Sequence, residues 1–514
     1  MKNTTIAGAK DLVRAALEVY RDDPAASAAL QDYARRLSEP LRVAIAGMVK
    51  AGKSTLLNAI IGEEIAPTDT GECTRIVTWY RHGHTPRITL YPVEGEPRNL
   101  PLKRVDGRLV FVLGDVQAED VQRLDVQWPA PALQAMTLID TPGIASLSGE
   151  VSARSTSFLA PADAPSEADA IIYLMRHMHA SDLRFLESFA DTMAGRSGTV
   201  NALAVLSRAD EVGAGRIDSL LSAGEIAERY RRDHNLRKLA LGVVPVAGLL
   251  AQSARSMRQP DFDSLRLLAQ LDRPVRERML LSADRFLRAT DPEGMTAKAR
   301  ASLLQRYGLF GIRLAVVLIR NGFDEPTPLA HELARRSGLD PLLEMLGRQF
   351  QARADALKAR TALVAVDTLL RSSPREGTGD LAAALERLQV NAHEFRELRL
   401  LASLRTSGVA LNPELAAEAE RLIGGWGAAS HVRLGLEPEA TPEQLSDEVR
   451  SNLARWRALA ANPLTDRAAL EACRVVIRSC EGILAEASAR ELHRQISQRS
   501  ALQEPVRHPK PLSA

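Results

Sequence analysis

The chain of 514 residues has few cysteines, few aromatic residues and little net charge. Its three cysteines are too few for a disulfide framework, so we expect a protein of the reducing cytosol. A formal net charge of +2 argues against a molecule-wide field that would attract nucleic acid. Aromatic residues make up only 4% of the chain, whereas Ala, Leu, Arg and Glu are frequent, which favours helix over sheet.

Long hydrophobic runs are also missing. The N-terminal stretch MKNTTIAGAKDLVRAAL lacks the apolar segment of a secretory signal, and no run of about 18 apolar residues follows it. The most apolar stretch, GLFGIRLAVVLI at 308–319, has the length of a core helix. We therefore expect a buried helix that packs on the sheet, with insertion into a membrane surface as the alternative.

Two kinds of periodicity divide the chain. From about 41 to 248, short apolar runs alternate with helical patterns, which predicts an α/β fold with a mixed, mostly parallel sheet and helices on both faces. Beyond about 253, apolar residues recur at three- and four-residue steps, which predicts an elongated all-α bundle. The domains we expect are 1–39 (a helix that joins the bundle), 40–337 (the α/β domain with helical additions after 253), 338–495 (the helical bundle) and 496–514 (a disordered tail).

The stretch GMVKAGKS at 47–54 matches G-x-x-x-x-G-K-[ST] between a predicted strand and a predicted helix. Such a loop aims backbone N–H groups at phosphates, and the helix adds the positive end of its dipole. We expect Lys53 to neutralise the β- and γ-phosphates and Ser54 to ligate Mg²⁺. A chance glycine-rich turn is the alternative. The further nucleotide contacts expected here are Gly47, Lys50, Ala51, Gly52 and Thr55.

Two more motifs complete the expected magnesium site. MTLIDTPG ends a predicted strand with Asp140, which can hold Mg²⁺ through a water, and Gly143 can offer its N–H to the γ-phosphate. Thr74, in PTDTGECTRIVT, is the candidate for a second hydroxyl ligand on a loop that orders when the γ-phosphate is bound. An ordinary loop threonine is the alternative.

The residue expected to orient the attacking water is missing. Ile144 follows Gly143, and isoleucine cannot act as a glutamine would, so the loop backbone or a partner molecule would have to position the water. Lys50 adds positive charge to the phosphate loop and could offset transition-state charge; a solvent-facing role is the alternative. The expected catalytic residues are therefore Lys53, Thr74 and Lys50.

The stretch ALAVLSRADEVG predicts which nucleotide binds. A strand ends at 207–210 (SRAD), where GTP-binding proteins carry Asn/Thr-Lys-x-Asp. A carboxylate only accepts hydrogen bonds, so Asp210 suits the N1–H and 2-amino group of guanine, and adenine has no such edge. The Arg208 stem can lie flat over the base, and Val246 and Ala247 are expected to add a backbone contact. A solvated turn is the alternative.

Together, GMVKAGKST, GECT, DTPG and SRAD, with a helix before them and a long helical half after them, resemble the dynamin superfamily in its bacterial branch. VLSRADEVGAGR and YGLFGIRLAVVLI are similar to the isoniazid-inducible, IniC-like proteins of actinobacteria. The resemblance implies a self-assembling GTPase whose G domains pair across the nucleotide and whose bundle transmits the change to a membrane. Lys50 departs from the pattern, because eukaryotic dynamins place a serine there.

We therefore expect a dynamin-like GTPase that uses Mg²⁺, is stimulated by assembly, and acts peripherally on the inner face of the plasma membrane, in remodelling or maintenance under envelope stress or drug exposure. Expected partners are GTP and GDP, further copies of the chain, an anionic lipid surface and a sister dynamin-like protein, but not nucleic acid. Trp426, in a glycine-rich apolar loop, is the candidate for lipid contact, with a bundle-end contact as the alternative. The alternative functions are an Era-like ribosome or RNA factor, which would need a basic RNA module, and a non-hydrolysing GTP-binding scaffold.

Overall fold

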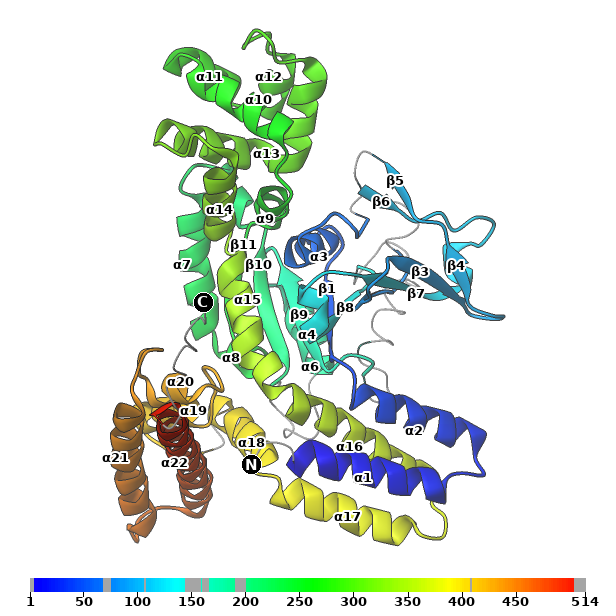
Figure 1. Ribbon diagram of the computed structural model, residues 1–514, viewed down its shortest axis with the longest axis vertical. Coiled ribbons are helices and arrows are strands. Elements are labelled where there is room, and N and C mark those ends of the chain that lie inside the picture. The colour runs from blue at the N-terminus through cyan, green and yellow to red at the C-terminus, as the bar shows by residue number, and fades with distance from the viewer. Residues whose placement is uncertain are drawn as a thin grey trace, which may run out of the picture. The chain divides into compact units, whose positions relative to one another are not determined.

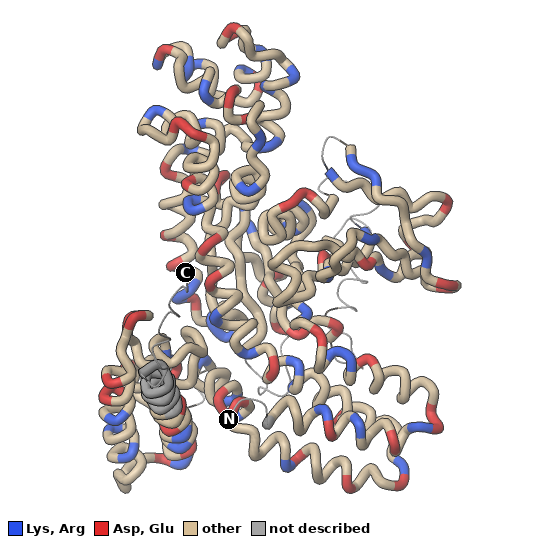
Figure 2. The backbone as a smooth tube through the Cα atoms, in the orientation of Figure 1, with Lys and Arg blue, Asp and Glu red and all other residues tan. Residues whose placement is uncertain are grey.

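The computed structural model describes residues 4–67, 75–105, 108–143, 159, 166–189, 200–406 and 409–502, with side chains described as far as 488. The chain forms two compact units, Met1–Gln389 (unit 1) and Val390–Ala514 (unit 2). Unit 1 contains the strands of the large sheet (Figure 1). Figure 2 shows Lys and Arg mixed with Asp and Glu along the helices of unit 1, in keeping with the small net charge of +2.

The central feature of unit 1 is a nine-stranded sheet in the order β11-β10-β9-β1-β8-β2-β7-β3-β4. Neighbours from β11 to β8 run parallel, as do β2 and β7, whereas β2–β8, β3–β7 and β3–β4 are antiparallel. This confirms the mixed, mostly parallel sheet predicted from the sequence. The strands are β1 (Leu41–Gly47), β2 (Thr78–His82), β3 (Arg87–Pro92), β4 (Arg98–Leu100), β7 (Val121–Trp128), β8 (Met136–Asp140), β9 (Ala170–Met175), β10 (Ala202–Ser207) and β11 (Val243–Val246), with a separate hairpin of β5 (Lys103–Val105) and β6 (Arg108–Val110).

Helices cover the sheet because β1, β9 and β10 are buried along their whole length and need apolar partners on both faces. α3 (Lys53–Ile61) packs with α9 (Gly248–Arg255) and α15 (Leu339–Gln349), while α7 (Ser219–Arg232) packs with α8 (His234–Leu239), which also contacts α6 (Ala180–Ser188). α3 and α7 lie on opposite sides of the sheet in Figure 1. Unit 1 also contains α4 (Ala132–Ala135), α14 (Pro326–Arg336) and the 3₁₀ segments Ala118–Asp120, Ala209–Ala214 and Gln351–Arg353, besides the helices described below.

The N-terminal segment forms two helices rather than the single helix expected within 1–39. α1 (Thr4–Val19) and α2 (Pro24–Arg36) are separated because Asp23 caps α2, its side chain accepting a 3.0 Å hydrogen bond from the Ala26 N–H, and Pro24 starts the new helix. Both helices pack against α16 (Ala354–Ser372). α17 (Thr378–Asn391) continues this helical bundle, with Leu388 against Gly8 of α1.

The apolar stretch at 308–319 forms the second half of α13 (Ala297–Arg320). Within the described ranges, α13 is the single helix that could cross a membrane by length and composition alone, and 56% of its apolar window is buried. Gly308, at φ 62° and ψ 175°, interrupts the helix. The stretch is a buried helix, as expected. The main helical neighbours of α13 are α9 and α10 (Gln259–Gln270), whereas packing on the sheet was expected.

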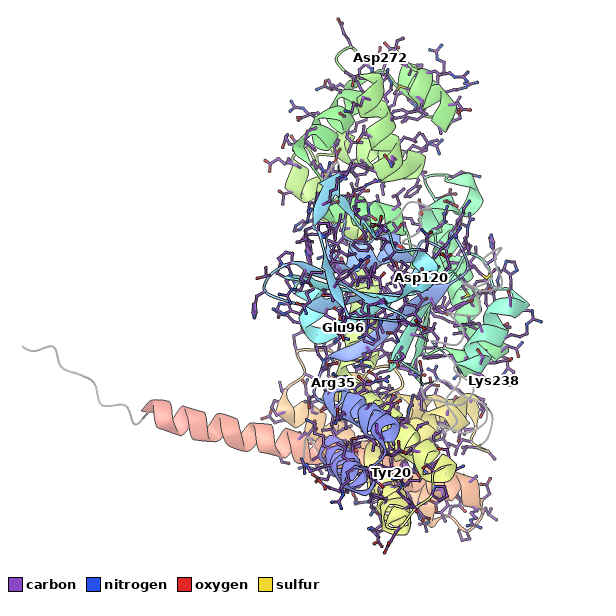
Figure 3. All side chains as sticks on the ribbon, turned by 90° about the vertical axis from the view of Figure 1, so that its right-hand side faces the viewer. Tyr20, Arg35, Glu96, Asp120, Lys238 and Asp272 are labelled. Atoms are coloured by element: carbon purple, nitrogen blue, oxygen red, sulfur yellow. The ribbon has the colours of Figure 1, made fainter. Side chains whose placement is uncertain are left out.

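These helical additions form one end of unit 1. α11 (Arg273–Met279) and α12 (Ala283–Arg288) follow α10, and α12 packs against α13. Figure 3 shows Asp272, between α10 and α11, at one end of unit 1 and Tyr20 and Arg35 of the N-terminal helices at the other, with Asp120 of the sheet region between them.

Unit 2 is entirely helical in its described part: α18 (His393–Arg405), α19 (Pro413–Leu422), α20 (Ser430–Leu434), α21 (Pro442–Ala461) and α22 (Arg467–Leu502). α21 and α22 form a helical hairpin against which α18, α19 and α20 pack. The helical half predicted from the sequence therefore contributes helices to both units. α15 and α16 lie beyond the expected domain limit at 337 but belong to unit 1, because α15 packs on α3 and β11.

Candidate nucleotide site

The phosphate loop joins β1 to α3 in the conformation that its glycines permit. Gly47 and Gly52 have φ values of 145° and 95°, which are unfavourable for residues with a Cβ. A Cβ on Gly47 would lie 2.3 Å from the carbonyl oxygen of Leu174 on β9, so the loop leaves the sheet where a side chain has no space. The two glycines required by the motif are thus explained by backbone geometry.

Lys53 begins α3 and is largely buried beneath this loop. Its amine donates hydrogen bonds to the carbonyl oxygens of Gly47 at 3.1 Å and Met48 at 3.2 Å. Burial lowers the pKa of Lys53, and the nearby carboxylate of Asp140 raises it again in part. The amine is therefore held inside the loop that is expected to bind phosphate.

Asp140 reaches the phosphate loop because β8 runs parallel to β1 with Asp140 opposite Ile45. The Ser54 hydroxyl donates a 2.7 Å hydrogen bond to Oδ2 of Asp140. Burial raises the pKa of Asp140, and Lys53 and the Ser54 hydroxyl act in the opposite direction.

The other carboxylate oxygen of Asp140 tests whether a metal would fit here. Oδ1 is buried and has no hydrogen-bond partner among the described residues. A carboxylate oxygen without a partner beside a serine hydroxyl is a donor set that suits Mg²⁺, which prefers oxygen ligands and keeps several waters. Asp140 and Ser54 therefore fit the ion that the sequence predicts.

The segment after β8 also approaches the phosphate loop. The Thr141 hydroxyl donates a 2.9 Å hydrogen bond to the carbonyl oxygen of Ile45 and anchors the turn. A Cβ on Gly143 would lie 2.5 Å from Cγ2 and 2.9 Å from Cα of Val49. Gly143 is thus brought against the loop, where its N–H could meet a phosphate. Thr74 and Ile144 lie outside the described residues.

A cavity of about 150 Å³ lies between the phosphate loop and the segment SRAD at 207–210, which we call the base loop. Asp210 is one of its lining residues, and burial raises the pKa of this carboxyl, with the neighbouring Glu211 charge adding to the effect. The carboxylate is an acceptor at the wall of a pocket, as recognition of guanine would require. The lining residues are Ala51, Gly52, Thr55, Leu56, Leu174, Val205, Ser207, Arg208, Asp210, Glu211, Val246, Gly248 and Leu249.

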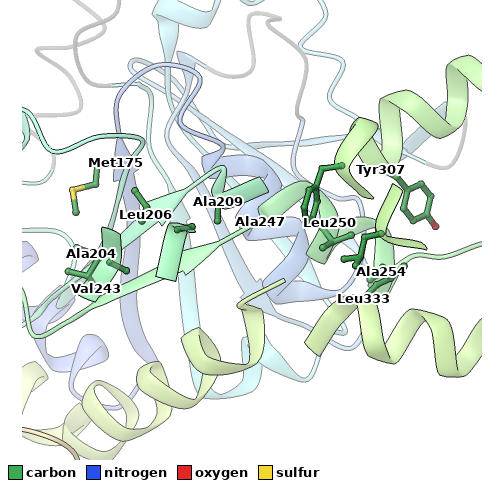
Figure 4. Close-up of a cluster of buried hydrophobic side chains, with 14 of the residues drawn as sticks. Met175, Ala204, Leu206, Ala209, Val243, Ala247, Leu250, Ala254, Tyr307 and Leu333 are labelled. Carbon is green, nitrogen blue, oxygen red and sulfur yellow. The ribbon is translucent and has the colours of Figure 1, made fainter. Parts of the chain in front are cut away.

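The end of β11 contributes to this pocket in part. Val246 lines the cavity, but Ala247 does not, and its N–H donates a 2.8 Å hydrogen bond to the carbonyl oxygen of Ser337. Figure 4 shows Ala247 within the apolar cluster, with Leu206, Ala209 and Leu250 also drawn. Ala247 therefore belongs to the buried apolar core, whereas its neighbours Val246 and Gly248 line the pocket.

Two charged residues that the sequence analysis did not single out also belong to the site. Glu211 lines the cavity and pairs with Arg208 and with Arg176, which follows β9. The position of Glu211 directly after Asp210 was a signal that could have identified it. Arg176 had no such signal, because its place depends on β9 lying beside β10. Lys50 meets the site through its carbonyl oxygen, which accepts from Arg208, while its side chain is exposed.

The chain is similar to a protein-family model, to proteins from bacteria and to a solved structure. The dynamin family model matches residues 43–204. The isoniazid-induced protein IniC of Mycobacterium tuberculosis is 42% identical over 485 residues, which cover 93% of this chain and 98% of IniC. The bacterial dynamin-like protein of Nostoc punctiforme is 27% identical over 214 residues, or 38% of this chain and 28% of that protein. A chain from a solved oligomerised bacterial dynamin pair, described as sensing and tethering membranes, aligns with 98% of this chain and 94% of its own length at 12% identity and a TM-score of 0.32.

Proposed function

Because this chain belongs to the dynamin family of GTPases and is similar to the bacterial protein IniC along nearly its whole length, we propose that it hydrolyses GTP to GDP and phosphate with Mg²⁺. We also propose that turnover rises when copies of the chain associate through their GTPase domains. The family predicted from the motifs is confirmed. The observation that carries the proposal is that the phosphate loop and Asp210 line one cavity, so a single nucleotide can meet both.

Each side chain has a defined task in this proposal. Lys53 would exchange its bonds to loop carbonyls for bonds to the β- and γ-phosphate oxygens. When bound, Mg²⁺ supplies positive charge to the phosphates, and Ser54, Asp140 and Thr74 are the residues proposed to hold it. The Gly143 N–H would donate to the γ-phosphate, and the exposed Lys50 ammonium would offset negative charge in the transition state.

Nucleotide binding and turnover test this part of the proposal. Calorimetry of the full chain should detect GTP and GDP binding and little binding of ATP, and turnover per molecule should rise with protein concentration. Lys53→Ala should lower kcat/KM by about 100-fold or more, since it removes positive charge aimed at the transferred phosphoryl group. Lys238→Ala, on α8, is the control and should change neither the affinity for GTP nor kcat/KM. Equal affinity for ATP, or turnover independent of concentration, would contradict the proposal.

We propose further that the protein acts on the inner face of the plasma membrane and contacts anionic lipid through Trp426. The support comes from exposure: Trp426 is 53% exposed in the segment between α19 and α20, whereas Trp79, Trp128 and Trp456 are buried. An exposed tryptophan suits the interface between water and lipid, because its ring is apolar and its N–H is polar.

Tryptophan fluorescence measures this contact directly. Adding anionic liposomes should shift the emission to shorter wavelength, and Trp426→Ser should abolish the shift and weaken co-sedimentation. Leu464→Ser is a useful control, since Leu464 is 91% exposed in the connection between α21 and α22 and is a second exposed apolar residue of unit 2. Binding that is lost in Leu464→Ser and kept in Trp426→Ser would assign the contact elsewhere.

The remaining expectations each have a test. Membership of the dynamin family favours a mechanoenzyme over the Era-like ribosome factor, and ribosome co-sedimentation would have to be absent. Measurable turnover at high protein concentration would exclude a non-hydrolysing scaffold. A sister dynamin-like protein as partner, and a role in envelope stress or drug response, are part of the proposal. Co-purification and transcript levels after drug exposure test them.

A further inference from the structure

Two residues of the candidate site share an unusual backbone conformation. Lys50 and Arg208, at φ values of 63° and 53°, are the two non-glycine residues with positive φ in the described parts of the chain. The left-handed conformation is unfavourable for a residue with a Cβ and persists only where surrounding contacts hold it. Lys50 lies in the phosphate loop and Arg208 at the start of the base loop, 158 positions later.

Arg208 and Lys50 are also hydrogen-bonded to each other. Nε and Nη2 of Arg208 both donate to the carbonyl oxygen of Lys50, at 3.2 and 2.9 Å. The guanidinium thus spans the gap between the two loops that line the cavity, and its fork geometry fixes the direction of the Lys50 carbonyl. Arg208 is also one of the residues that line the cavity.

A carboxylate holds the other side of the same guanidinium. Nη1 of Arg208 donates to Oε1 of Glu211 at 2.6 Å, and Nη2 of Arg176 donates to Oε2 of Glu211 at 2.6 Å. Arg176 can reach this point because β9 and β10 are neighbours with Met175 opposite Leu206, so both strands deliver their next residues at one edge of the sheet (Figure 1). The result is a continuous chain of polar contacts from Arg176 through Glu211 and Arg208 to the phosphate loop.

We propose that Glu211 and Arg176 are positioning residues for the guanine nucleotide, which hold Arg208 against the Lys50 carbonyl so that the phosphate loop and the pocket wall are ordered before the nucleotide binds. This inference rests on the proposed function. The side chains of these two ion pairs are 37–49% exposed, so each pair by itself would contribute little to stability. The two ion pairs matter here because Glu211 holds Arg208, and Arg208 in turn bonds the Lys50 carbonyl of the phosphate loop. Removing the Glu211 carboxylate therefore loosens both the base loop and the phosphate loop.

Glu211→Gln in the full chain tests the inference, and Glu228→Gln is the matched control. Glu228 on α7 has the same 45% side-chain exposure and also pairs with two arginines, Arg231 and Arg232. We expect Glu211→Gln to raise KM for GTP and the dissociation rate of a fluorescent GDP by about three- to fivefold, with kcat changed less than about twofold. The control should leave all three unchanged. Equal behaviour of the two variants would overturn the inference.

A second variant separates positioning from charge. Arg176→Met should produce a smaller rise in the same two quantities, and the double variant should show less than the sum of the two effects. If Glu211 acted only through its charge on Asp210, its removal would lower the pKa of Asp210 and tighten GTP binding in acid. Positioning predicts weaker binding at every pH. A native chain that ignores guanine nucleotides would defeat the proposed function itself, whereas normal native binding with an unchanged Glu211→Gln variant defeats the positioning role alone.

Discussion

The hydroxyl of Ser54 and the carboxylate of Asp140 are hydrogen-bonded at 2.7 Å, although 86 positions separate them in the sequence. The contact exists because β1 and β8 are parallel neighbours, so that the end of β8 meets the start of α3. It leaves one buried carboxylate oxygen without a partner among the described residues. Ser54 and Asp140 are therefore suited to hold a metal when nucleotide is bound.

Asp140→Asn tests that role. The amide keeps the shape of the side chain but loses its charge, so turnover with Mg²⁺ should fall by about 10- to 100-fold. Binding of GDP in the presence of a chelator should change by less than about twofold, because the metal takes no part there. Fluorescent-nucleotide titrations with and without Mg²⁺ measure the difference. An equal loss in both conditions would mean that Asp140 supports only the fold.

Asp210→Asn should change the choice of base. An amide can donate a hydrogen bond where the carboxylate only accepts, so GTP affinity should fall by about 10-fold or more while affinity for the xanthosine nucleotide rises. Competition titrations with GTP, XTP and ATP give the ratios. Asp218→Asn, at the start of α7, is a control away from the pocket. Retained GTP selectivity would count against Asp210 as the residue that reads the base.

Gly143→Ala should impair turnover while the chain stays folded. The added methyl group would stand 2.9 Å from Cα and 3.1 Å from N of Val49, both backbone atoms that cannot rotate away, so one of the two loops must move. We expect kcat to fall by about 10-fold or more with a circular dichroism spectrum like that of the native chain. Gly224→Ala, where a Cβ would meet nothing within 4 Å, is the control and should be neutral.

The stability of unit 2 should depend on acid through Glu397. Burial alone would raise the pKa of Glu397, but Arg433, His393 and the Ser479 hydroxyl lower it to about 2, below its ordinary value of 4.5. Because the folded-state pKa is depressed, the stabilisation is complete above about pH 4.5 and is lost as the pH falls from there toward 2.

Hydrogen exchange of α18 and α22 in the full chain measures this stabilisation. Protection should decrease over that pH interval, and Glu397→Gln should remove both the protection and its pH dependence, since Arg433 is then left without its buried partner. We expect a loss of roughly 3 kcal/mol at neutral pH. Glu481→Gln, a more exposed carboxylate on α22, should have little effect. An unchanged acid profile in Glu397→Gln would exclude this carboxylate as the cause.

Local patterns predicted several elements well. The strands expected from MTLIDTPG and ALAVLSRADEVG are present as β8 and β10, because a short continuous apolar run is typical of a parallel strand that is buried on both faces. β7 was missed although it is eight residues long, since its charged residues interrupt the apolar pattern. The N-terminal helix was expected in one piece because its apolar periodicity continues past Asp23 and Pro24.

The sequence by itself determined the chemistry of the site: which residues carry the charge, the hydroxyl and the carboxylates, and which glycines leave space for phosphate. These are local properties, because they depend on residue type and on spacing within one loop. The tertiary structure alone decided which of these groups meet. Arg176, Glu211, Arg208 and Lys50 form one chain of contacts only because two strands are neighbours in the sheet, and strand order depends on packing between segments far apart in the sequence.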